Sequence, residues 1–431
     1  MKLLSRFDLF KYAILAFPLA FAGLPIYVHS PDYYATEFGQ SLASIGILLL
    51  VLRLIDAVQD PLIGQLSDKY HQHRRIIFSI GLIMLSIGFY MIFQPRTDYI
   101  LTWFGVSVFI CTTGFSIATI NLQAVGGLWH MESKERTRVS SWREGLGLIG
   151  LLVASITPAI LANQFSSQIA FQLMSLILGV GLGVSAFIFF KWFESAELDV
   201  PRTDKIFGFL SILRDKWMKK FSIIFIISSF ASAIPGVLVL FFVRDYLQLE
   251  QFTGLFLFLY FVAGASAMPI WQKISHYVGK PKAWMFSMVL AVITFIWAFG
   301  LNQGDMISFA IICILSGSAL GADLAIPPAM MADHIAHTKT QNLVTRYYSI
   351  STFLSKLALA LATGITLPLL AILGYQAGES AGASVLSFAY ALIPCGLKII
   401  AAFLLFLNLN QFNEGEYHEK NTDSNGVHHV A

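Results

Sequence analysis

The sequence predicts an all-α membrane protein with twelve transmembrane helices in two six-helix bundles. Of its 431 residues, 56% are hydrophobic and only 12% are charged, and the mean hydropathy is +0.70. A soluble domain carries about 25% charged residues, so this composition excludes a single water-soluble core. Apolar runs long enough to cross a bilayer as helices recur along the chain. The small net charge of +3 gives no indication of a nucleic-acid partner.

One long polar stretch divides the apolar runs into two sets of six. Before it we expect helices over residues 12–28, 41–63, 76–93, 100–126, 145–161 and 169–190. After it we expect helices over residues 221–243, 252–271, 284–300, 306–331, 347–373 and 383–409. The expected domains are a first six-helix bundle (1–192), a central loop (193–220), a second six-helix bundle (221–409) and a disordered polar tail (410–431).

Local features refine these elements. Pro18 and Pro25 predict a kink in the first helix, which either packs against its neighbours or lines a cavity. We expect this helix to be retained, because no convincing small-residue cleavage site follows it. A polar loop is expected over residues 29–40, and residues 206–213 are expected to form a short amphipathic helix on the membrane surface. The three cysteines lie in apolar runs and predict buried side chains without a disulfide or metal site.

Lysine and arginine are distributed very unequally between the two sides of the expected helices. Of 28 such residues, 23 fall in loops on the side of the two termini. Two others fall on the opposite side and three lie within helices, at Arg53, Lys356 and Lys398. Cytoplasmic loops carry an excess of these residues. We therefore expect a multi-pass protein of the plasma membrane (in a bacterium, the inner membrane) with both termini, the central loop and the tail in the cytoplasm.

Three charged residues lie in the second apolar run, which reads RLIDAVQDPLIG from residue 53 to residue 64. At about 100° per residue, Arg53, Asp56 and Asp60 fall within about 60° of one another on a helix. Each would cost about 2.5 to 3.5 kcal/mol if it faced lipid, so this stripe should face protein or a wet cavity. Two carboxylates one turn apart suit a small cation; the alternative is an ion-pair network that only locks the helix. Pro61 and Gly64 are expected to end this helix.

Three motifs resemble those of one transporter family. RLIDAVQDPLIG is similar to the helix-2 motif R-x-x-D-A-x-x-D-P-x-x-G of the glycoside–pentoside–hexuronide:cation symporters, the melibiose-permease-like branch of the major facilitator superfamily. ERTRVSSWR (residues 135–143) resembles the loop that leads into helix 5 of that branch, and residues 331–356 resemble its loop after helix 10 with a following helix-11 lysine. The loop GQLSDKYHQHRR is similar to the superfamily signature G-x-x-x-D-[RK]…R-R, although its spacing after Lys69 differs. It places Gly64, Asp68, Lys69, Arg74 and Arg75 in a cytoplasmic gate loop.

The resemblance implies roles for several residues. Asp56 and Asp60 match the carboxylates that hold the coupling cation. Lys356 matches the helix-11 lysine near those carboxylates and, with Arg53, is expected to complete a charge network that couples ion and substrate. A lone ammonium at mid-membrane also needs a carboxylate partner on physical grounds alone. Arg143 matches a cavity-lining arginine. Alternatives are a structural counter-ion for Lys356 and an ordinary cytoplasmic anchor for Arg143.

This chain departs from its relatives where they bind sugar. Melibiose-type members hold sugar hydroxyls with acidic residues on helices 1 and 4, whereas here residues 12–28 contain no acid and the helix-4 position falls at Thr119. Thr119, Asn121 and Gln123 are therefore candidates for the substrate cavity, or alternatively for hydrogen bonds between helices. Uncharged side chains bind hydroxyls less strongly than carboxylates do. The departure favours a less polar, amphipathic or anionic substrate.

The second half carries fewer signals. Asp323, four residues before Pro327-Pro328, is a candidate for contact with substrate or ion in an unwound helix segment. Asp333 is expected to tether the loop between the tenth and eleventh helices, and Lys398 has no expected partner. No nucleophile–base pair or metal-ligand cluster occurs within the expected helices, so we expect neither catalytic nor metal-binding residues and no enzyme activity. No ATP-binding loop motif occurs either.

Together these observations predict a cation-coupled secondary symporter that moves a small organic solute by alternating access. The resemblance implies a sugar or glycoside, with Na⁺ or H⁺ as the coupling ion and no cofactor. One alternative is a carrier of an amphipathic or anionic solute such as a lysolipid, siderophore or organic acid, imported or exported. Another is a non-transporting membrane scaffold or sensor. The expected partners are the solute, a monovalent cation and the lipid bilayer; we expect a monomer and no nucleic acid.

Overall fold

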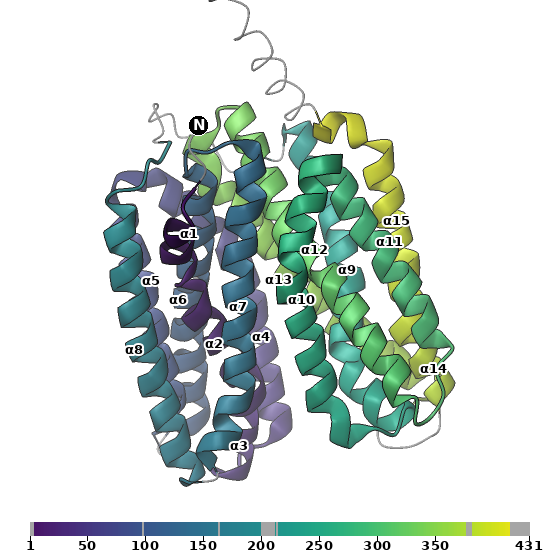
Figure 1. The fold of residues 1–431 in the computed structure, drawn as a ribbon. Coiled ribbons are helices and arrows are strands. Elements are labelled where there is room, and N and C mark those ends of the chain that lie inside the picture. The colour runs from purple at the N-terminus through teal and green to yellow at the C-terminus, as the bar shows by residue number, and fades with distance from the viewer. Residues whose placement is uncertain are drawn as a thin grey trace, which may run out of the picture. The chain divides into compact units, whose positions relative to one another are not determined.

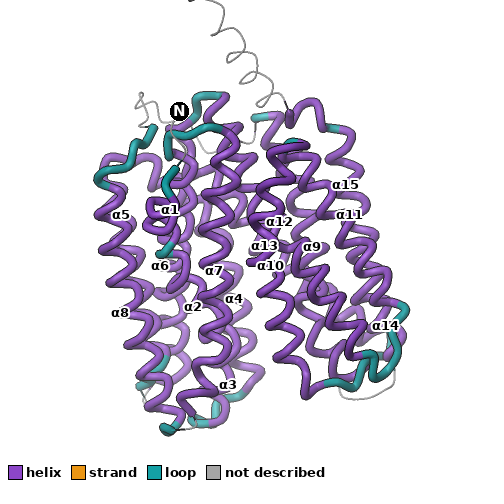
Figure 2. Tube along the Cα trace, viewed as in Figure 1, coloured by secondary structure: helices purple, strands orange, loops and turns teal. Residues whose placement is uncertain are grey.

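The computed structural model describes residues 4–96, 99–162, 164–199, 212, 214–375 and 382–413. Nearly all of this part of the chain is helical, and its extended structure is limited to one isolated bridge between Trp129 and Leu198 (Figures 1 and 2). Within these residues, ten helices are long and apolar enough to cross a membrane. The predicted all-α membrane fold is confirmed.

The first two expected spans differ from those ten. The second is α4 (Leu42–Lys69), whose 28 residues extend roughly 42 Å at 1.5 Å per residue. The first is divided into short pieces, and the π-helical turn η1 (Pro25–His29) begins at one of the two expected prolines. The loop expected after it is partly wrong, because α3 (Ser30–Thr36) continues the helix. The Ser30 hydroxyl donates to the Ile26 carbonyl at 2.6 Å, and a proline lies in the first turn of α3, where no intrahelical N–H bond is lost.

The chain clusters into two compact units. Unit 1 consists of Met1–Met131, Trp142–Phe209 and Gln341–Phe353. Its most extensive helix contact joins α5 and α6. A glycine allows this close approach, since a Cβ on Gly88 would lie 2.4 Å from the Cys111 nitrogen. The helices assigned wholly to unit 1, besides those already given, are α1 (Arg6–Ala13), α2 (Ala16–Leu24), η2 (His71–His73), α5 (Arg74–Ile92), α6 (Ile100–Leu128), α8 (Ser167–Phe193) and η7 (Gln341–Leu343).

Unit 2 consists of Glu132–Ser141, Leu210–Thr340 and Leu354–Ala431. Phe242 stacks on Tyr390 with ring centroids 4.0 Å apart, within a buried apolar cluster. Its helices are α9 (Lys216–Phe241), η5 (Phe242–Tyr246), η6 (Glu250–Phe252), α10 (Thr253–Val278), α11 (Lys280–Phe299), α12 (Met306–His337), α14 (Ala383–Ser387), η8 (Phe388–Leu392) and α15 (Ile393–Leu407).

Two helices belong to both units. α7 (Ser133–Ala162) begins in unit 2 and continues in unit 1 from Trp142. α13 (Val344–Ile372) begins in unit 1 and continues in unit 2 from Leu354. Each half of the sequence therefore contributes a short helical segment to the unit formed mainly by the other half.

Several helices extend further into polar segments than expected. α4 continues past Ile63, and both Pro61 and Gly64 lie inside it, so the prediction that they end the helix is wrong. A proline removes only one backbone hydrogen bond, which a long packed membrane helix tolerates. Similarly, α7 begins within the charged segment that was expected to be a loop. α12 runs without interruption through Pro327 and Pro328, so the segment around Asp323 is helical and not unwound.

Two expected segments fall largely outside the described residues. Of the amphipathic helix expected over residues 206–213, the structure describes only Ile212. Of the expected disordered tail, residues 414–431 are not described, and residues 410–413 are helical.

Candidate functional site

One face of α4 is buried and the opposite face is exposed. Asp56 and Asp60 are 5% and 0% exposed, whereas Leu54, Val58 and Leu62 are 50%, 63% and 63% exposed. The exposed side chains are apolar, as a lipid-facing surface requires. The stripe deduced from helical periodicity therefore places both carboxylates on the buried face of α4.

Neutral polar side chains from α4 and α6 donate hydrogen bonds to Asp56. Ser116 Oγ and Gln59 Nε2 donate to Asp56 Oδ1 at 3.0 and 2.9 Å, and Thr113 Oγ1 donates to Gln59 Oε1 at 3.0 Å. Ser116 and Thr113 belong to α6, which packs along α4. Carboxylate, hydroxyl and amide oxygens are the ligand types that hard cations prefer. This arrangement can hold a metal cation such as Na⁺, or a proton on one carboxylate.

The polar residues of α6 were apparent from the sequence, but their contact with Asp56 was not predicted. A signal was present in the spacing of α6, because Thr113 and Ser116 lie six and three residues before Thr119. Residues three apart are neighbours on one helix face. The sequence therefore predicts a polar face on α6. It does not predict that this face packs against the charged stripe of α4.

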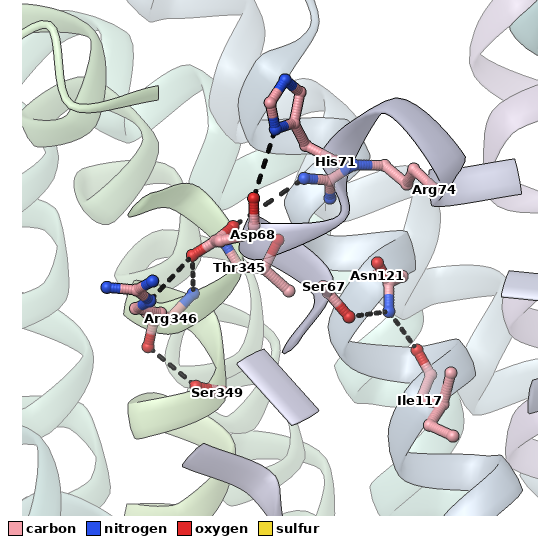
Figure 3. Close-up of polar contacts among 9 residues, drawn as sticks. All are labelled: Ser67, Asp68, His71, Arg74, Ile117, Asn121, Thr345, Arg346 and Ser349. Atoms are coloured by element: carbon pink, nitrogen blue, oxygen red, sulfur yellow. Dashed lines mark hydrogen bonds and ion pairs between the residues drawn. The ribbon is translucent and has the colours of Figure 1, made fainter. Parts of the chain in front are cut away.

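The three cavity candidates of the fourth expected span, which is α6, have different surroundings. Asn121 is buried and donates to Ser67 Oγ at 3.1 Å and to the Ile117 carbonyl at 2.8 Å (Figure 3). Because Ser67 belongs to α4, Asn121 forms the hydrogen bond between helices that was the alternative to cavity lining. Thr119 and Gln123 are partly buried on the same helix.

Asp68 binds the beginning of α13 within unit 1. Its Oδ1 accepts from the Thr345 backbone nitrogen and its Oδ2 from the Arg346 backbone nitrogen, both at 3.0 Å (Figure 3). The Arg346 guanidinium Nε lies 3.6 Å from Oδ2. The first N–H groups of a helix lack partners within the helix, and the helix dipole favours an anion there. Asp68 therefore caps α13 across 277 residues of sequence.

The other residues of the loop signature divide into two groups. Gly64 lies against α13, where an added Cβ would be 2.2 Å from Ser349 Oγ, and Arg74 Nη2 lies 3.8 Å from Asp68 Oδ1. These two residues therefore belong with Asp68. Arg75 instead pairs with Glu194.

Lys69 also lies apart from that cap. Its ammonium lies 5.2 Å from the centroid of the Tyr70 ring. The structure thus brings three of the five expected gate residues to the start of α13.

Arg143 is buried in unit 1. Its Nε and Nη2 donate to Glu144 Oε1 at 2.9 and 2.7 Å, and its Nη1 lies 3.5 Å from the Tyr12 hydroxyl. Tyr12 also contacts Trp129 and Trp192, with centroid distances of 5.7 and 5.5 Å. Arg143 is therefore part of an aromatic cluster and is not a solvated anchor at the helix start.

Lys398, which had no expected partner, forms an ion pair in unit 2. Its Nζ lies 2.5 Å from Asp323 Oδ2 and donates to Ser228 Oγ at 2.8 Å. Asp323 also accepts from Ser232 Oγ at 3.2 Å and from Trp284 Nε1 at 3.0 Å. The pair joins α12 to α15, 75 residues further along the chain. No local spacing in the sequence indicates such a partner.

Asp333 lies within α12 and does not tether a loop, so that expectation is wrong. It pairs with Lys280 at the start of α11, and the Arg136 Nε lies 3.5 Å from its Oδ1. Lys280 also donates to the Ser133 carbonyl and hydroxyl at 2.6 Å. Because α12 extends beyond its expected end, Asp333 joins three helices.

The expected charge network of Arg53 and Lys356 stays a prediction. Arg53 is partly buried on α4 in unit 1, and Lys356 is partly buried on α13 in unit 2.

Comparisons with known proteins connect this geometry to a family. Residues 9–410 match the family model described as "MFS/sugar transport protein". The inner membrane symporter YicJ of Escherichia coli (strain K12) is 22% identical over 400 residues, which cover 86% of this chain and 85% of that protein. The isoprimeverose transporter of Lactiplantibacillus pentosus is 22% identical over 446 residues, covering 93% and 88%. The sodium-dependent lysophosphatidylcholine symporter 1-A of Danio rerio is 21% identical over 383 residues, covering 77% and 71%.

The family match spans both halves of the chain and agrees with the three motifs. Its members are membrane transporters, so this multi-pass membrane protein is a transporter and not an enzyme. The chain belongs to the major facilitator superfamily, within the glycoside–pentoside–hexuronide:cation symporter family.

Proposed function

We propose that this protein is a Na⁺-coupled symporter that carries a sugar or glycoside by alternating access. The observation that carries the proposal is the burial of two carboxylates, Asp56 and Asp60, on one face of α4, with the Ser116 hydroxyl of α6 bonded to Asp56. Family membership supports cation-coupled transport of a small solute.

The cation site follows from the donor set. Asp56 and Asp60 supply negative charge, and Ser116 supplies a hydroxyl oxygen beside Asp56. The Gln59 amide presents its nitrogen to Asp56 and its oxygen to Thr113, so a flip of this amide would add a second neutral oxygen. A dehydrated cation needs several oxygen ligands to replace its water. A proton needs only one carboxylate with a raised pKa, so the neutral oxygens favour Na⁺ over H⁺. Rotation of the Ser116 hydroxyl would turn its lone pairs toward the ion.

The contact between Asp68 and the start of α13 is a candidate for a contact that changes during alternating access. Asp68 holds the first N–H groups of α13, and Gly64 allows the close approach of the two helices. We propose that this contact forms and breaks during the transport cycle, on the side expected to face the cytoplasm. When the contact breaks, the backbone N–H groups of Thr345 and Arg346 need other acceptors, and they return to Asp68 when it forms again.

Lys356 is the residue that the family resemblance assigns to coupling. We expect Lys356→Ala to leave the protein folded and able to bind solute, but without a dependence of solute binding on the cation. Unchanged cation dependence would remove Lys356 from the coupling mechanism.

A carrier of an amphipathic solute is the second candidate. Thr119 replaces the helix-4 acid that relatives use for sugar hydroxyls, and unit 2 contains a largely apolar cavity beside Asp323. One relative, the lysophosphatidylcholine symporter of Danio rerio, is named for an amphipathic solute, and this similarity supports the second candidate.

The test is a thermal-stability screen of the purified protein in detergent. Sugars, uronic acids, organic anions and lysolipids are each added with Na⁺, Li⁺ or K⁺ at two pH values. A ligand that binds only the folded state stabilises it by about 2.7 kcal/mol at a hundredfold excess over Kd. We expect a sugar or glycoside to stabilise the protein more in Na⁺ than in K⁺, and Asp56→Asn to remove that difference. Stabilisation by lysolipids alone would favour the second candidate, and a pH dependence without a Na⁺ dependence would identify H⁺.

A further inference from the structure

Unit 2 contains a partly open cavity of about 130 Å³ among α9, α10, α11, α12 and α15. Its walls are mainly apolar, and Phe256, Tyr260, Phe261 and Phe295 contribute aromatic rings. An apolar cavity of about 150 Å³ is large enough to bind benzene. The cavity therefore has room for one aromatic ring or a short alkyl group, and its aromatic lining suits both.

Polar groups also line this cavity. Asp323 and Lys398 line it together with Ser232. The Asp323 side chain is 18% exposed and the Lys398 side chain is 6% exposed, so the pair is buried but the carboxylate is not fully covered. A ligand in the cavity would meet one carboxylate and one ammonium side by side.

The ion pair selects for an uncharged ligand. Of the described lining residues, Asp323 and Lys398 carry charge, and their charges cancel. A charged ligand would have to displace one partner, and separating a buried pair is strongly unfavourable because it leaves the other charge uncompensated. An uncharged ligand leaves the pair intact.

The pair nevertheless keeps hydrogen-bonding capacity for a hydroxyl. Asp323 Oδ1 accepts a hydrogen bond from Trp284 Nε1, and a carboxylate oxygen can accept two. The Lys398 ammonium donates to Asp323 and Ser228, and it has three N–H groups. One hydroxyl group can donate to Asp323 and accept from Lys398 at the same time.

We propose that this cavity is a binding site for an uncharged glycoside with an aromatic or short alkyl aglycone. The aglycone occupies the apolar space, and the sugar ring lies outside this volume with one of its hydroxyls bridging Asp323 and Lys398. The inference rests on the proposed function, since it assumes that glycosides are the solutes carried. It also places in unit 2 a carboxylate for sugar hydroxyls, which the first and fourth helices lack.

The proposal can be tested with a nitrophenyl glycoside as the probe, on the protein in lipid nanodiscs. The nitrophenyl group quenches nearby tryptophan fluorescence, and Trp284 donates to Asp323 beside the cavity. We expect saturable quenching by the nitrophenyl glycoside and a smaller amplitude in Trp284→Phe. The charged probe nitrophenyl phosphate should bind at least tenfold more weakly.

Two variants of α11 provide the decisive control. Ala291 lines the cavity, and Ala291→Phe should fill it and weaken binding at least tenfold. Ile293 is 63% exposed on the same helix, and Ile293→Phe should leave binding unchanged. Equal affinity in both variants, or tighter binding of nitrophenyl phosphate, would overturn the proposal. The melting temperatures of both variants are measured as a check that they fold.

Failure of this inference is distinguishable from failure of the proposed function. The quenching is measured in K⁺ and repeated with Asp56→Asn, so it does not depend on the proposed cation site. If Na⁺-dependent stabilisation by free sugars persists while nitrophenyl glycosides do not bind in the cavity, only the cavity assignment is wrong. If nitrophenyl glycosides bind but no solute shows cation dependence, the cavity assignment stands and the coupling proposal is wrong.

Discussion

Two aspartates, Asp56 in unit 1 and Asp323 in unit 2, differ in the groups that the structure shows donating to them. Asp56 accepts from the hydroxyl of Ser116 and the amide of Gln59, whereas Asp323 accepts from the ammonium of Lys398. A neutral hydrogen bond contributes about 0.5 to 1.5 kcal/mol, so such a donor can turn away when a cation arrives. Removing one partner of a buried ion pair costs about 3 to 5 kcal/mol. The site at Asp56 is therefore suited to binding and releasing a cation, whereas the Asp323–Lys398 ion pair is suited to staying intact.

The largest effect should come from breaking the fixed pair. Lys398→Met leaves the Asp323 carboxylate buried beside apolar groups, and we expect it to destabilise the protein by about 3 to 5 kcal/mol. Thermal unfolding in detergent measures this loss. The double variant Asp323→Asn/Lys398→Met should recover most of the stability, because no uncompensated charge remains. A single variant as stable as the wild type would show that the pair is not a fixed structural element.

The next effect tests the exchangeable site. Loss of a group that only orients a metal ligand lowers metal affinity by about 10- to 100-fold, so loss of a charged ligand should cost at least about 100-fold. We expect Asp56→Asn to lower Na⁺-driven uptake of the solute by that factor in proteoliposomes, with little change in melting temperature in the absence of Na⁺. Uptake with a wild-type Na⁺ dependence would place the cation elsewhere. A fall in melting temperature comparable to that of Lys398→Met would erase the contrast between the sites.

A smaller effect is expected at the neutral partner. Ser116→Ala removes one neutral oxygen beside Asp56. Because a neutral oxygen attracts a cation less than a carboxylate does, we expect Na⁺ affinity to fall about tenfold, less than in Asp56→Asn. Ser116→Thr keeps the hydroxyl and should retain affinity within about threefold on the same reasoning. Titration of the melting temperature with Na⁺ measures both. Equal losses in the two variants would point to packing of α6 instead of the hydroxyl.

The last and most local effect is expected at the start of α13. Asp68→Ala removes the acceptor for two backbone N–H groups, and loss of such a cap costs about 0.5 to 2 kcal/mol. The variant also removes the carboxylate beside the buried guanidinium groups of Arg74 and Arg346, which adds to that cost. Hydrogen exchange at Thr345 and Arg346 should become faster, while exchange in the middle of α13 should not change. Unaltered exchange at these two amides would show that Asp68 does not hold the helix start.

Helical periodicity predicted part of the site because it is a local property. The 100° spacing of Asp56 and Asp60 was sufficient to place both carboxylates on the buried face of α4. Partners from other helices were beyond such reasoning. The sequence spacing between Asp323 and Lys398 does not show that α12 and α15 contact one another, so Lys398 had no expected partner.

The boundaries of the helices were harder to predict than their presence. Gly64 was expected to end α4, because glycine is common at helix ends. Its missing Cβ instead allows α4 to approach Ser349 on α13, a contact between residues far apart in sequence. Asp333 was expected in a loop because its neighbours in sequence are polar. Its partners Lys280 and Arg136 are far away in sequence and could not be predicted from it.

Direct binding of radioactive Na⁺ to the purified protein tests the central claim most directly. The wild type should bind Na⁺ saturably, and Asp60→Asn should lose that binding while keeping the wild-type melting temperature in Na⁺-free buffer. Asp323→Asn/Lys398→Met should bind Na⁺ as the wild type does, because its carboxylate is not part of the exchangeable site. Saturable Na⁺ binding of wild-type affinity in Asp60→Asn would contradict the account.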